Sequence, residues 1–251
     1  MKTVEFIKRE LPYAVNEELK QLRTNIKFCG DDKRVIMLTS SISGEGKSTV
    51  AIDLAKSFKE LGAKVLLIDT DMRKSYLKHY VRDYRHQVHY GLSHYLTGQC
   101  KLNEAMYKTE EEVYVVFAGP VPPNPSELLS NKRMENLIAK SRDLFDYIII
   151  DCPPIGAVID AAIVSKLCDG AIIVVEAGKV SYRMAQGVKE QLDASGCPIL
   201  GVVLNKVDLR KKGRYYKSYY YYKKYGYYSK YSKQYGNGQA ELGAAEDEID
   251  F

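Results

Sequence analysis

The amino-acid sequence predicts an α/β protein with a doubly wound, mostly parallel sheet, followed by a flexible, tyrosine-rich C-terminal tail. Short, nearly continuous apolar runs alternate with helical patterns up to Asp208, where the apolar periodicity stops. Such runs are typical of parallel strands that are covered on both faces. In a sheet of this kind, ligands bind at the carboxyl ends of the strands. With 45% hydrophobic and 27% charged residues, the composition excludes a disordered or collagen-like chain.

Six strands and five helices account for most of this pattern. The expected strands are the runs rich in β-branched residues, at Val35–Thr39, Val65–Ile68, Val113–Phe117, Tyr147–Ile150, Ala171–Val175 and Ile199–Leu204. The expected helices have apolar residues at helical spacing, at Val15–Phe28, Ser48–Leu61, Ser126–Leu144, Ala161–Leu167 and Ser181–Ser195. The polar segment from Arg73 to Gly91 is expected to be a surface loop.

A phosphate-binding motif follows the first strand, where the sequence reads VIMLTSSISGEGKSTVA. A glycine-rich loop between a strand and a helix is the context that the P-loop motif requires, so we expect a sheet of the P-loop NTPase type. Lys47 would reach the outer phosphates, and the Ser48 hydroxyl would bind Mg²⁺. Ser41 stands where the usual motif has glycine. The residues expected to contact the nucleotide in this loop are Ser43, Gly44, Glu45, Gly46, Lys47, Ser48 and Thr49.

Acidic residues follow two further strands. Asp69 and Asp71 lie in LLIDTDMR, which ends in Arg73, and Asp151 lies in YIIIDCPP. Carboxylates at the ends of parallel strands would meet the P-loop in one crevice, where they are suitable ligands for Mg²⁺. The candidate metal ligands are Ser48, Asp69, Asp71 and Asp151, and the candidate catalytic residues are Lys47, Asp69, Asp71, Arg73 and Asp151. Either Asp69 or Asp71 would accept the proton of an acceptor hydroxyl, and the spacing leaves their division of roles open.

Tyrosine and positive charge are concentrated near the C-terminus. Eleven of the 21 tyrosines lie between Tyr215 and Tyr235, and residues 210–240 hold nine Lys or Arg and no acid. Residues 241–251 hold five acids and no base. The net charge of +5 therefore divides into a nearly neutral body and a basic tail, so these tyrosines are not expected to form a core.

The composition also bears on the cellular compartment. The five cysteines form no CxxC pair and no zinc-binding spacing, which predicts reduced thiols in a cytosol. The N-terminus has no apolar stretch long enough for a signal peptide, and no run approaches the ~20 apolar residues of a membrane span. We expect a cytoplasmic protein that a partner recruits to any membrane at which it acts.

These segments resemble those of the bacterial protein-tyrosine kinases that accompany capsule and exopolysaccharide synthesis. SISGEGKST, LLIDTDMR, YIIIDCPP and GPVPPNPSELL are similar to that family's segments in order and spacing, over about residues 10–208. The resemblance implies a protein-tyrosine kinase that uses ATP and Mg²⁺ and regulates capsular and exopolysaccharide synthesis and export. From the P-loop, the three acids and the tyrosine cluster, we expect that one subunit phosphorylates the tail of another in trans. The resemblance divides the chain into an N-terminal segment with an oligomerisation helix (1–30), a P-loop kinase domain (31–209) and the tail (210–251).

The resemblance also implies acceptors and partners. The implied acceptors are Tyr215, Tyr216, Tyr219, Tyr220, Tyr221, Tyr222, Tyr225, Tyr227, Tyr228, Tyr231 and Tyr235. Some relatives carry transmembrane segments in the same chain, and this one is similar to the split form. A separate transmembrane activator of the polysaccharide co-polymerase type would recruit it to the inner face of the cell membrane. A cognate phosphotyrosine phosphatase is also implied.

Glu17, Lys20 and Arg23 resemble the family's Glu-x-x-Arg-x-x-Arg helix, which joins subunits into a ring-like homo-oligomer. Lys20 stands where that pattern has Arg, which keeps the charge but loses bidentate geometry. Without the resemblance, the three residues would be interpreted as a solvated helix face with a weak ion pair.

Three alternatives remain. A partitioning or division-site P-loop ATPase shares the sheet and the second Asp motif, but its signature Lys is replaced here by Ile42. Asn205-Lys206-Val207-Asp208 matches the guanine-binding NKxD pattern of GTPases, although Asn205 is more simply assigned to an adenine edge. The third is a nucleic-acid-binding NTPase that uses the interleaved Lys and Tyr of the tail. We expect no nucleic acid, because acceptors beside a phosphoryl donor are the simpler account.

Overall fold

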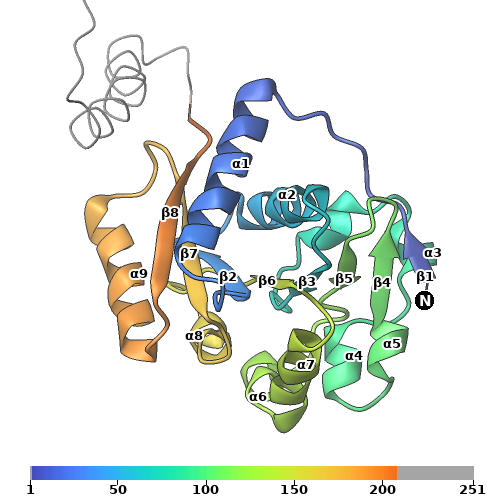
Figure 1. Cartoon of the computed structure of the whole chain (residues 1–251). Helices are drawn as coiled ribbons and strands as arrows, with labels where there is room; N and C mark the ends of the chain where they lie inside the picture. The colour runs from blue at the N-terminus through green and yellow to red at the C-terminus, as the bar shows by residue number, and fades with distance from the viewer. Residues whose placement is uncertain (1, 208–251) are drawn as a thin grey trace, which may run out of the picture. The chain divides into compact units, whose positions relative to one another are not determined.

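The computed structural model describes residues 2–207 of the chain. Within them, eight strands form one sheet in the order β1-β4-β5-β3-β6-β2-β7-β8 (Figure 1). The strands are β1 (Lys2–Val4), β2 (Val35–Ser40), β3 (Val65–Asp69), β4 (Met106–Thr109), β5 (Tyr114–Val116), β6 (Tyr147–Asp151), β7 (Gly170–Glu176) and β8 (Ile199–Asn205). All neighbouring pairs are parallel except β4 and β5. The doubly wound, mostly parallel sheet is therefore confirmed.

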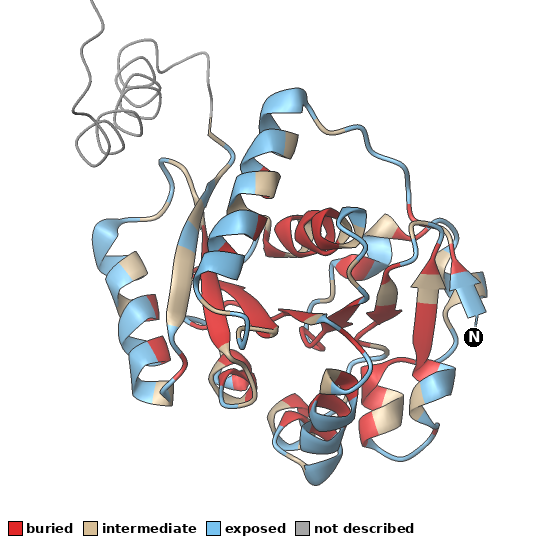
Figure 2. Cartoon of the chain, in the orientation of Figure 1, coloured by how far each residue is buried: buried red, intermediate tan, exposed pale blue. Residues whose placement is uncertain are grey.

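Helices cover both faces of the sheet (Figures 1 and 2). They are α1 (Tyr13–Phe28), α2 (Lys47–Glu60), the 3₁₀ helix η1 (Leu77–Tyr80), α3 (Tyr84–Gln87), α4 (Leu92–Leu96), α5 (Leu102–Ala105), α6 (Pro125–Leu129), α7 (Lys132–Arg142), α8 (Asp160–Ser165) and α9 (Tyr182–Ser195). Successive residues of a strand point to opposite faces, so Ile36 and Leu38 of β2 join the core under α1 and α2. Val35 and Met37 join the core formed with α4, α7, α8 and α9.

Three expectations about local structure were wrong. The single helix expected over Ser126–Leu144 is broken at Ser130, because the Asn131 side chain caps the Met134 N–H at 3.1 Å and starts α7 afresh. Strands β1 and β4 were missed, since their three and four residues are too few to show a pattern. The segment from Arg73 to Gly91 contains η1 and α3 and buries Leu77, so it is not wholly a surface loop.

The N-terminal segment is part of the same compact unit as the rest of residues 1–207. β1 extends the sheet by pairing with β4, and α1 packs against α2. Arg9 lies in the chain segment between β1 and α1, and its side chain donates to Asp53 of α2. The expected boundary at residue 30 is therefore not visible as a structural division. The tail and its eleven candidate tyrosines lie outside the described residues.

Candidate active site

The loop between β2 and α2 contains two glycines with left-handed backbone conformations. The φ angle is 88° at Gly44 and 92° at Gly46. A Cβ atom at Gly46 would lie 2.2 Å from Nδ2 of Asn205, whereas one at Gly44 would meet nothing within 4 Å. Because α2 begins at Lys47, the free N–H groups of its first turn face this loop. The sequence therefore folds locally into the strand, loop and helix of a phosphate site.

A buried carboxylate holds the loop together from inside. The Glu45 side chain is fully buried and accepts the N–H of Ile42 at 2.8 Å and that of Glu176 at 3.0 Å. Glu176 is the last residue of β7, so Glu45 ties the phosphate loop to the neighbouring strand. The sequence placed Glu45 among the nucleotide contacts, but its side chain points away from solvent and is a support for the loop.

The end of β8 holds the loop from outside. Asn205 donates from Nδ2 to the Glu45 carbonyl at 2.9 Å. Lys206 donates to the Gly44 carbonyl at 2.6 Å and to the Glu176 carboxylate at 3.0 Å. Two residues of the NKxD-like segment, Asn205 and Lys206, therefore bind the phosphate loop of the protein itself. The sequence placed Lys206 in the NKxD-like pattern without assigning it a role, and it gave no signal for Glu176. The roles of both residues become visible only where β7, β8 and the loop meet.

Two acidic residues lie side by side at the carboxyl ends of neighbouring strands. Asp69 of β3 and Asp151 of β6 are register partners, and both are almost completely buried. Lys47, at the start of α2, is also buried. Burial raises the pKa of Asp69 well above its usual range, and the charge of Asp151 adds to this. Burial raises the pKa of Asp151 to about 6, against the opposing effects of Lys47 and the Ser48 hydroxyl.

The hydrogen bonds of these carboxylates differ. Asp69 accepts the Asp71 N–H at 3.0 Å and the Ser75 hydroxyl, so both of its oxygens have partners. Asp71 accepts the Lys74 N–H at 2.9 Å. Oδ1 of Asp151 is buried and has no hydrogen-bond partner among residues 2–207. An orphaned carboxylate oxygen beside a phosphate loop fits an Mg²⁺ ion or one of its waters.

The described residues bring no three His, Cys, Asp or Glu side chains into one metal-binding group. Magnesium in nucleotide sites is commonly bound through one or two carboxylates together with phosphates and water. Of the four candidate metal ligands, Ser48 and Asp151 therefore fit this chemistry best. Both oxygens of Asp69 are already occupied.

Arg73 is held by two residues that the sequence did not single out as site residues. Its guanidinium donates to Asp160 through Nε at 2.7 Å and Nη2 at 3.1 Å, and Nη2 also donates to the Ser126 hydroxyl at 3.1 Å. The Asp160 side chain is fully buried. Burial raises the pKa of Asp160, but the bonds from Arg73 and Ser126 outweigh it and leave that pKa below its usual value. Ser126 belongs to GPVPPNPSELL, which was the available signal.

Thr49, the last of the expected nucleotide contacts, shares a hydrogen bond with the hydroxyl of Tyr80 in η1. This bond joins the first turn of α2 to the segment that follows Asp71 and Arg73. The bond therefore fixes η1 against the first turn of α2.

The candidate oligomer helix divides into two environments. Glu17 and Lys20 form an exposed ion pair at 2.8 Å. Arg23 is 8% exposed and donates to the carbonyl and, at 3.1 Å, to the hydroxyl of Ser57 in α2. The alternative interpretation of all three residues as a solvated face does not fit Arg23, because its side of α1 packs against α2. The role of the three residues between subunits stays a prediction.

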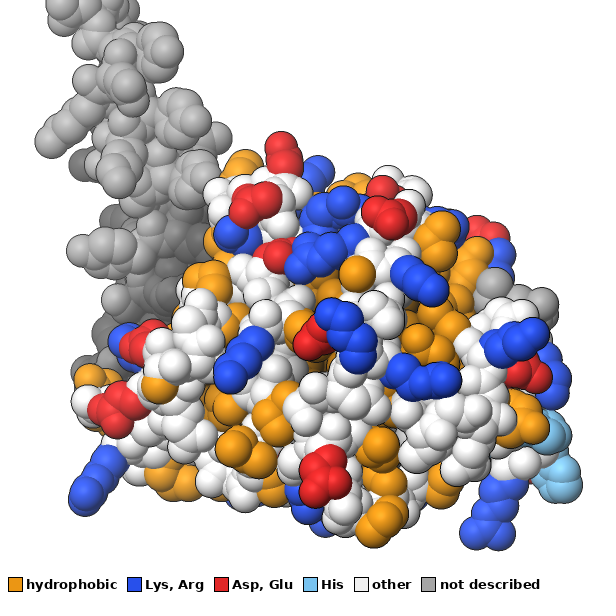
Figure 3. Space-filling model, turned by 90° about the horizontal axis from the view of Figure 1, so that it is seen from below, with side chains coloured by type: hydrophobic (Ala, Val, Ile, Leu, Met, Phe, Trp, Pro, Cys, Tyr) orange, Lys and Arg blue, Asp and Glu red, His pale blue; other side chains and the backbone are white. Residues whose placement is uncertain are grey.

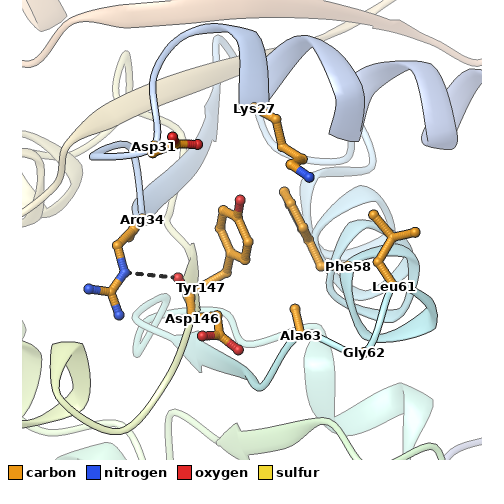
Figure 4. Close-up of a pocket in the computed structure, with 9 residues that line it drawn as sticks. All are labelled: Lys27, Asp31, Arg34, Phe58, Leu61, Gly62, Ala63, Asp146 and Tyr147. Carbon is orange, nitrogen blue, oxygen red and sulfur yellow. Dashed lines mark hydrogen bonds between the residues drawn. The ribbon is translucent and has the colours of Figure 1, made fainter.

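A separate cavity of about 440 Å³ lies at the opposite end of the sheet, where β2 and β6 begin (Figure 4). Its floor includes the stacked rings of Phe58 and Tyr147, with centroids 3.9 Å apart. Lys27 of α1 points toward these rings, whereas Arg34 donates to the Asp146 carbonyl. None of the candidate active-site residues lines this cavity.

Residues 33–194 match the family described as AAA domain. The chain is 43% identical to tyrosine-protein kinase CpsD of Streptococcus pneumoniae serotype 4 over 209 residues, which is 83% of this chain and 89% of that protein. Its structure is similar to the kinase domain of Escherichia coli tyrosine kinase ETK, with a TM-score of 0.73, 29% identity and coverage of 83% of this chain and 90% of that chain.

A more distant structural similarity is to the septum site-determining protein MinD of Pyrococcus horikoshii, which was solved with Mg-ADP. The TM-score is 0.58 at 30% identity, covering 68% of this chain and 69% of that one. The matches therefore share a P-loop fold that implies a nucleotide, and the more similar ones are kinases. The chain belongs to the bacterial tyrosine-protein kinases and is itself a protein-tyrosine kinase.

Proposed function

We propose that this kinase uses Mg-ATP to phosphorylate the tyrosine cluster of a second copy of the chain. The observation that carries the proposal is the meeting of Lys47, Asp69 and Asp151 beside the phosphate loop, in a chain that also holds eleven tyrosines within 21 residues. A dense set of acceptors on the same polypeptide makes the tail the nearest available protein substrate.

The residues divide the work of phosphoryl transfer in this proposal. Lys47 and the loop N–H groups would bind the phosphates, and Ser48 and Asp151 would hold Mg²⁺, which would supply positive charge to the transferred group. The acceptor tyrosine oxygen bonds to the γ-phosphorus, the bond to the ADP oxygen breaks, and the phenolic proton passes to a carboxylate. Asp69, whose pKa burial raises, suits that proton, and Asp71 is the alternative.

Two further residues complete the proposed site. Asp160 orients Arg73 by accepting hydrogen bonds from Nε and Nη2. The remaining nitrogen, Nη1, would donate to the phosphates and stabilise their negative charge. The Asn205 side chain donates from Nδ2 to the Glu45 carbonyl of the loop. Its Oδ1 would accept a hydrogen bond from the amino group of adenine. This assignment favours ATP over GTP.

The biological role follows from the charge of the tail. Each phosphate adds about −1.5 to −2 charges, so about five or six phosphates would cancel the nine bases of residues 210–240. In our proposal, this graded change loosens a ring of subunits held through the exposed Glu17 and Lys20 of α1, the helix that Arg23 fixes against α2. The loosening regulates capsular or exopolysaccharide synthesis and export. A phosphotyrosine phosphatase resets the tail.

The proposed partner is a separate membrane protein of the polysaccharide co-polymerase type. Within residues 2–207, no helix is long and apolar enough to cross a bilayer. Recruitment to the inner face of the cell membrane would then depend on the activating cytoplasmic segment of that partner.

Mixing two variants of the chain tests the proposal. A Lys47→Met chain supplies an intact tail without a working phosphate site, and a chain ending at residue 209 supplies the active site without a tail. Phosphotyrosine should form on the Lys47→Met chain only when the truncated chain, ATP and Mg²⁺ are all present. Labelling of Lys47→Met alone would contradict the site, and absence of labelling in the mixture would contradict transfer in trans.

The main alternative is a partitioning or division-site ATPase, and the structural similarity to MinD supports it. That group's signature Lys is absent, because Ile42 occupies the position. A nucleic-acid-binding NTPase is the other alternative, and the face in Figure 3 shows basic side chains interspersed with acidic and hydrophobic ones rather than gathered in a stripe. A gel-shift with mixed-sequence RNA at physiological salt would detect such binding.

A further inference from the structure

A small cavity of about 200 Å³ lies among the segment after Arg73, helix α4 and the loop after β5. It is smaller than the ~300–1,000 Å³ of drug-sized ligand sites, so it has room for one side chain rather than a nucleotide. Its lining contains three basic side chains and no acid, and the residues are Ser75, Lys78, Tyr84, Val88, His89, Tyr90, His94, Gly119 and Pro120.

The cavity is next to the proposed catalytic carboxylates. Ser75 lines it, and the Ser75 hydroxyl donates to Oδ2 of Asp69. Tyr84 forms another part of the lining, and its pKa is raised by burial and by the charge of Asp69. A single residue thus separates the cavity from the acid that we assign to the acceptor proton.

The basic groups are available to a ligand. Neither the Lys78 ammonium nor the His89 imidazole forms a hydrogen bond or ion pair with any of residues 2–207. His94 accepts the Gly91 N–H at Nδ1, at 3.1 Å, so its remaining proton is on Nε2. Tyr90 stands edge-on to the His94 ring, with centroids 5.4 Å apart. Aromatic walls with several N–H donors suit an aryl phosphate, whose ring is apolar and whose phosphate is anionic.

The unphosphorylated tail is a poor match for this lining, because both are basic. A tyrosine that has already received a phosphate is a good match, and the activity of the enzyme supplies it. We propose that the cavity binds a phosphotyrosine of the tail of a second copy and so keeps that tail at the active site for further transfers. This rests on the tail being the substrate.

The spacing of the tyrosines fits such retention. Tyr219, Tyr222, Tyr225, Tyr228 and Tyr231 recur at every third position. Three extended residues span at most ~10–11 Å. The backbone of the next acceptor tyrosine therefore lies within that distance of the backbone of a phosphotyrosine held beside Asp69. Retention would make chains with several phosphates accumulate while other chains still carry none.

Two variants of the full-length protein separate the cavity from general charge. Lys78→Gln/His89→Gln removes one lysine and one histidine from the lining, and His79→Gln/Lys140→Gln removes the same residue types outside it. The probe is a peptide of residues 213–229 with either tyrosine or phosphotyrosine at position 222. Its binding to phosphatase-treated protein is measured by fluorescence anisotropy without ATP.

We expect the phosphorylated peptide to bind about tenfold more tightly than the plain one to the wild type and to the control variant. The preference should fall below about twofold for Lys78→Gln/His89→Gln. Equal affinities for the wild type, or an unchanged preference in the cavity variant, would overturn the proposal. Because the phosphopeptide is synthetic, this result does not depend on whether the tail is the natural substrate.

Intact-mass measurements over time test the consequence. The cavity variant should acquire its first phosphate at the wild-type rate, whereas chains with three or more phosphates should be delayed until single phosphorylation is nearly complete. Identical distributions in the wild type and the cavity variant would contradict retention. Absence of phosphate from the wild type, the cavity variant and the His79→Gln/Lys140→Gln control would instead contradict the proposed function.

Discussion

Asp69 and Asp151 are direct register partners on the neighbouring parallel strands β3 and β6, with both carboxylates buried beside the phosphate loop. Burial raises the pKa of both acids, and the charge of Asp151 raises that of Asp69 further. Ionising both carboxylates is therefore unfavourable, and a bound cation would offset this cost.

The first prediction concerns stability without ligands. A carboxyl whose pKa is raised by folding contributes stability below its unfolded pKa of about 3.9 and loses it as the pH rises through the folded value. Asp69→Asn keeps the shape and the acceptor for the Asp71 N–H, and its new NH2 group can donate to the Ser75 hydroxyl, but the charge is removed. At pH 8, without nucleotide or metal, we expect it to be more stable by about 1 kcal/mol, or about 2–4 °C in thermal unfolding. A gain that persisted at pH 4 would contradict the electrostatic cause.

The second prediction concerns pH and nucleotide binding. Because protonated Asp151 is a poor metal ligand, Mg-nucleotide affinity should fall as the pH drops below its pKa of about 6. We expect about tenfold weaker binding one pH unit below that value. Titrations from pH 5 to pH 8 measure it. Asp151→Asn is the control, since it should bind weakly with only the pH dependence of the nucleotide itself.

The third prediction uses two glycines of the phosphate loop. Gly44 and Gly46 both have left-handed φ angles, but only at Gly46 would a Cβ atom collide with Asn205. Gly46→Ala should therefore displace the Asn205 amide and reduce kcat/KM for ATP at least about tenfold more than Gly44→Ala, or by ~1.4 kcal/mol. Equal losses would mean that backbone strain alone decides the effect.

The fourth prediction concerns the helix α1. Arg23→Ala removes a buried guanidinium that donates to Ser57, and hydrogen bonds from charged groups contribute about 1.5–3 kcal/mol. We expect a loss of that size in urea unfolding of dilute protein. Lys20→Ala breaks only an exposed pair and should cost less than about 1 kcal/mol. If both variants were equally stable and differed only in oligomer mass, Arg23 would act solely between subunits.

The fifth prediction concerns the support of Arg73. Asp160→Asn should release the guanidinium from its two-point contact and lower kcat by about tenfold, while KM for ATP changes less. Ser126→Ala, which leaves the Arg73–Asp160 contact in place, should have a smaller effect. Steady-state kinetics of folded variants with matched circular dichroism spectra distinguish this from unfolding. A change confined to KM would place Arg73 in substrate binding only.

The parallel α/β class, the phosphate loop and the two acidic strand ends could all be predicted from the amino-acid sequence. These features are local: apolar runs define buried strands, and Gly46, Lys47 and Ser48 carry their chemistry in consecutive positions. Their meeting could also be expected, because the carboxyl ends of parallel strands lie at one edge of a sheet.

The contacts that support that site could not be predicted, because they join residues that are far apart in the sequence. Asp160 is 87 residues from Arg73, and Glu176 is 131 residues from Glu45, so no local pattern links either pair. Arg23 shows the same limit on a helix, since its spacing from Glu17 and Lys20 is identical whether it faces solvent or α2. Packing chooses between those environments, because hydrogen bonds across the fold depend on how the helices and strands are placed against one another.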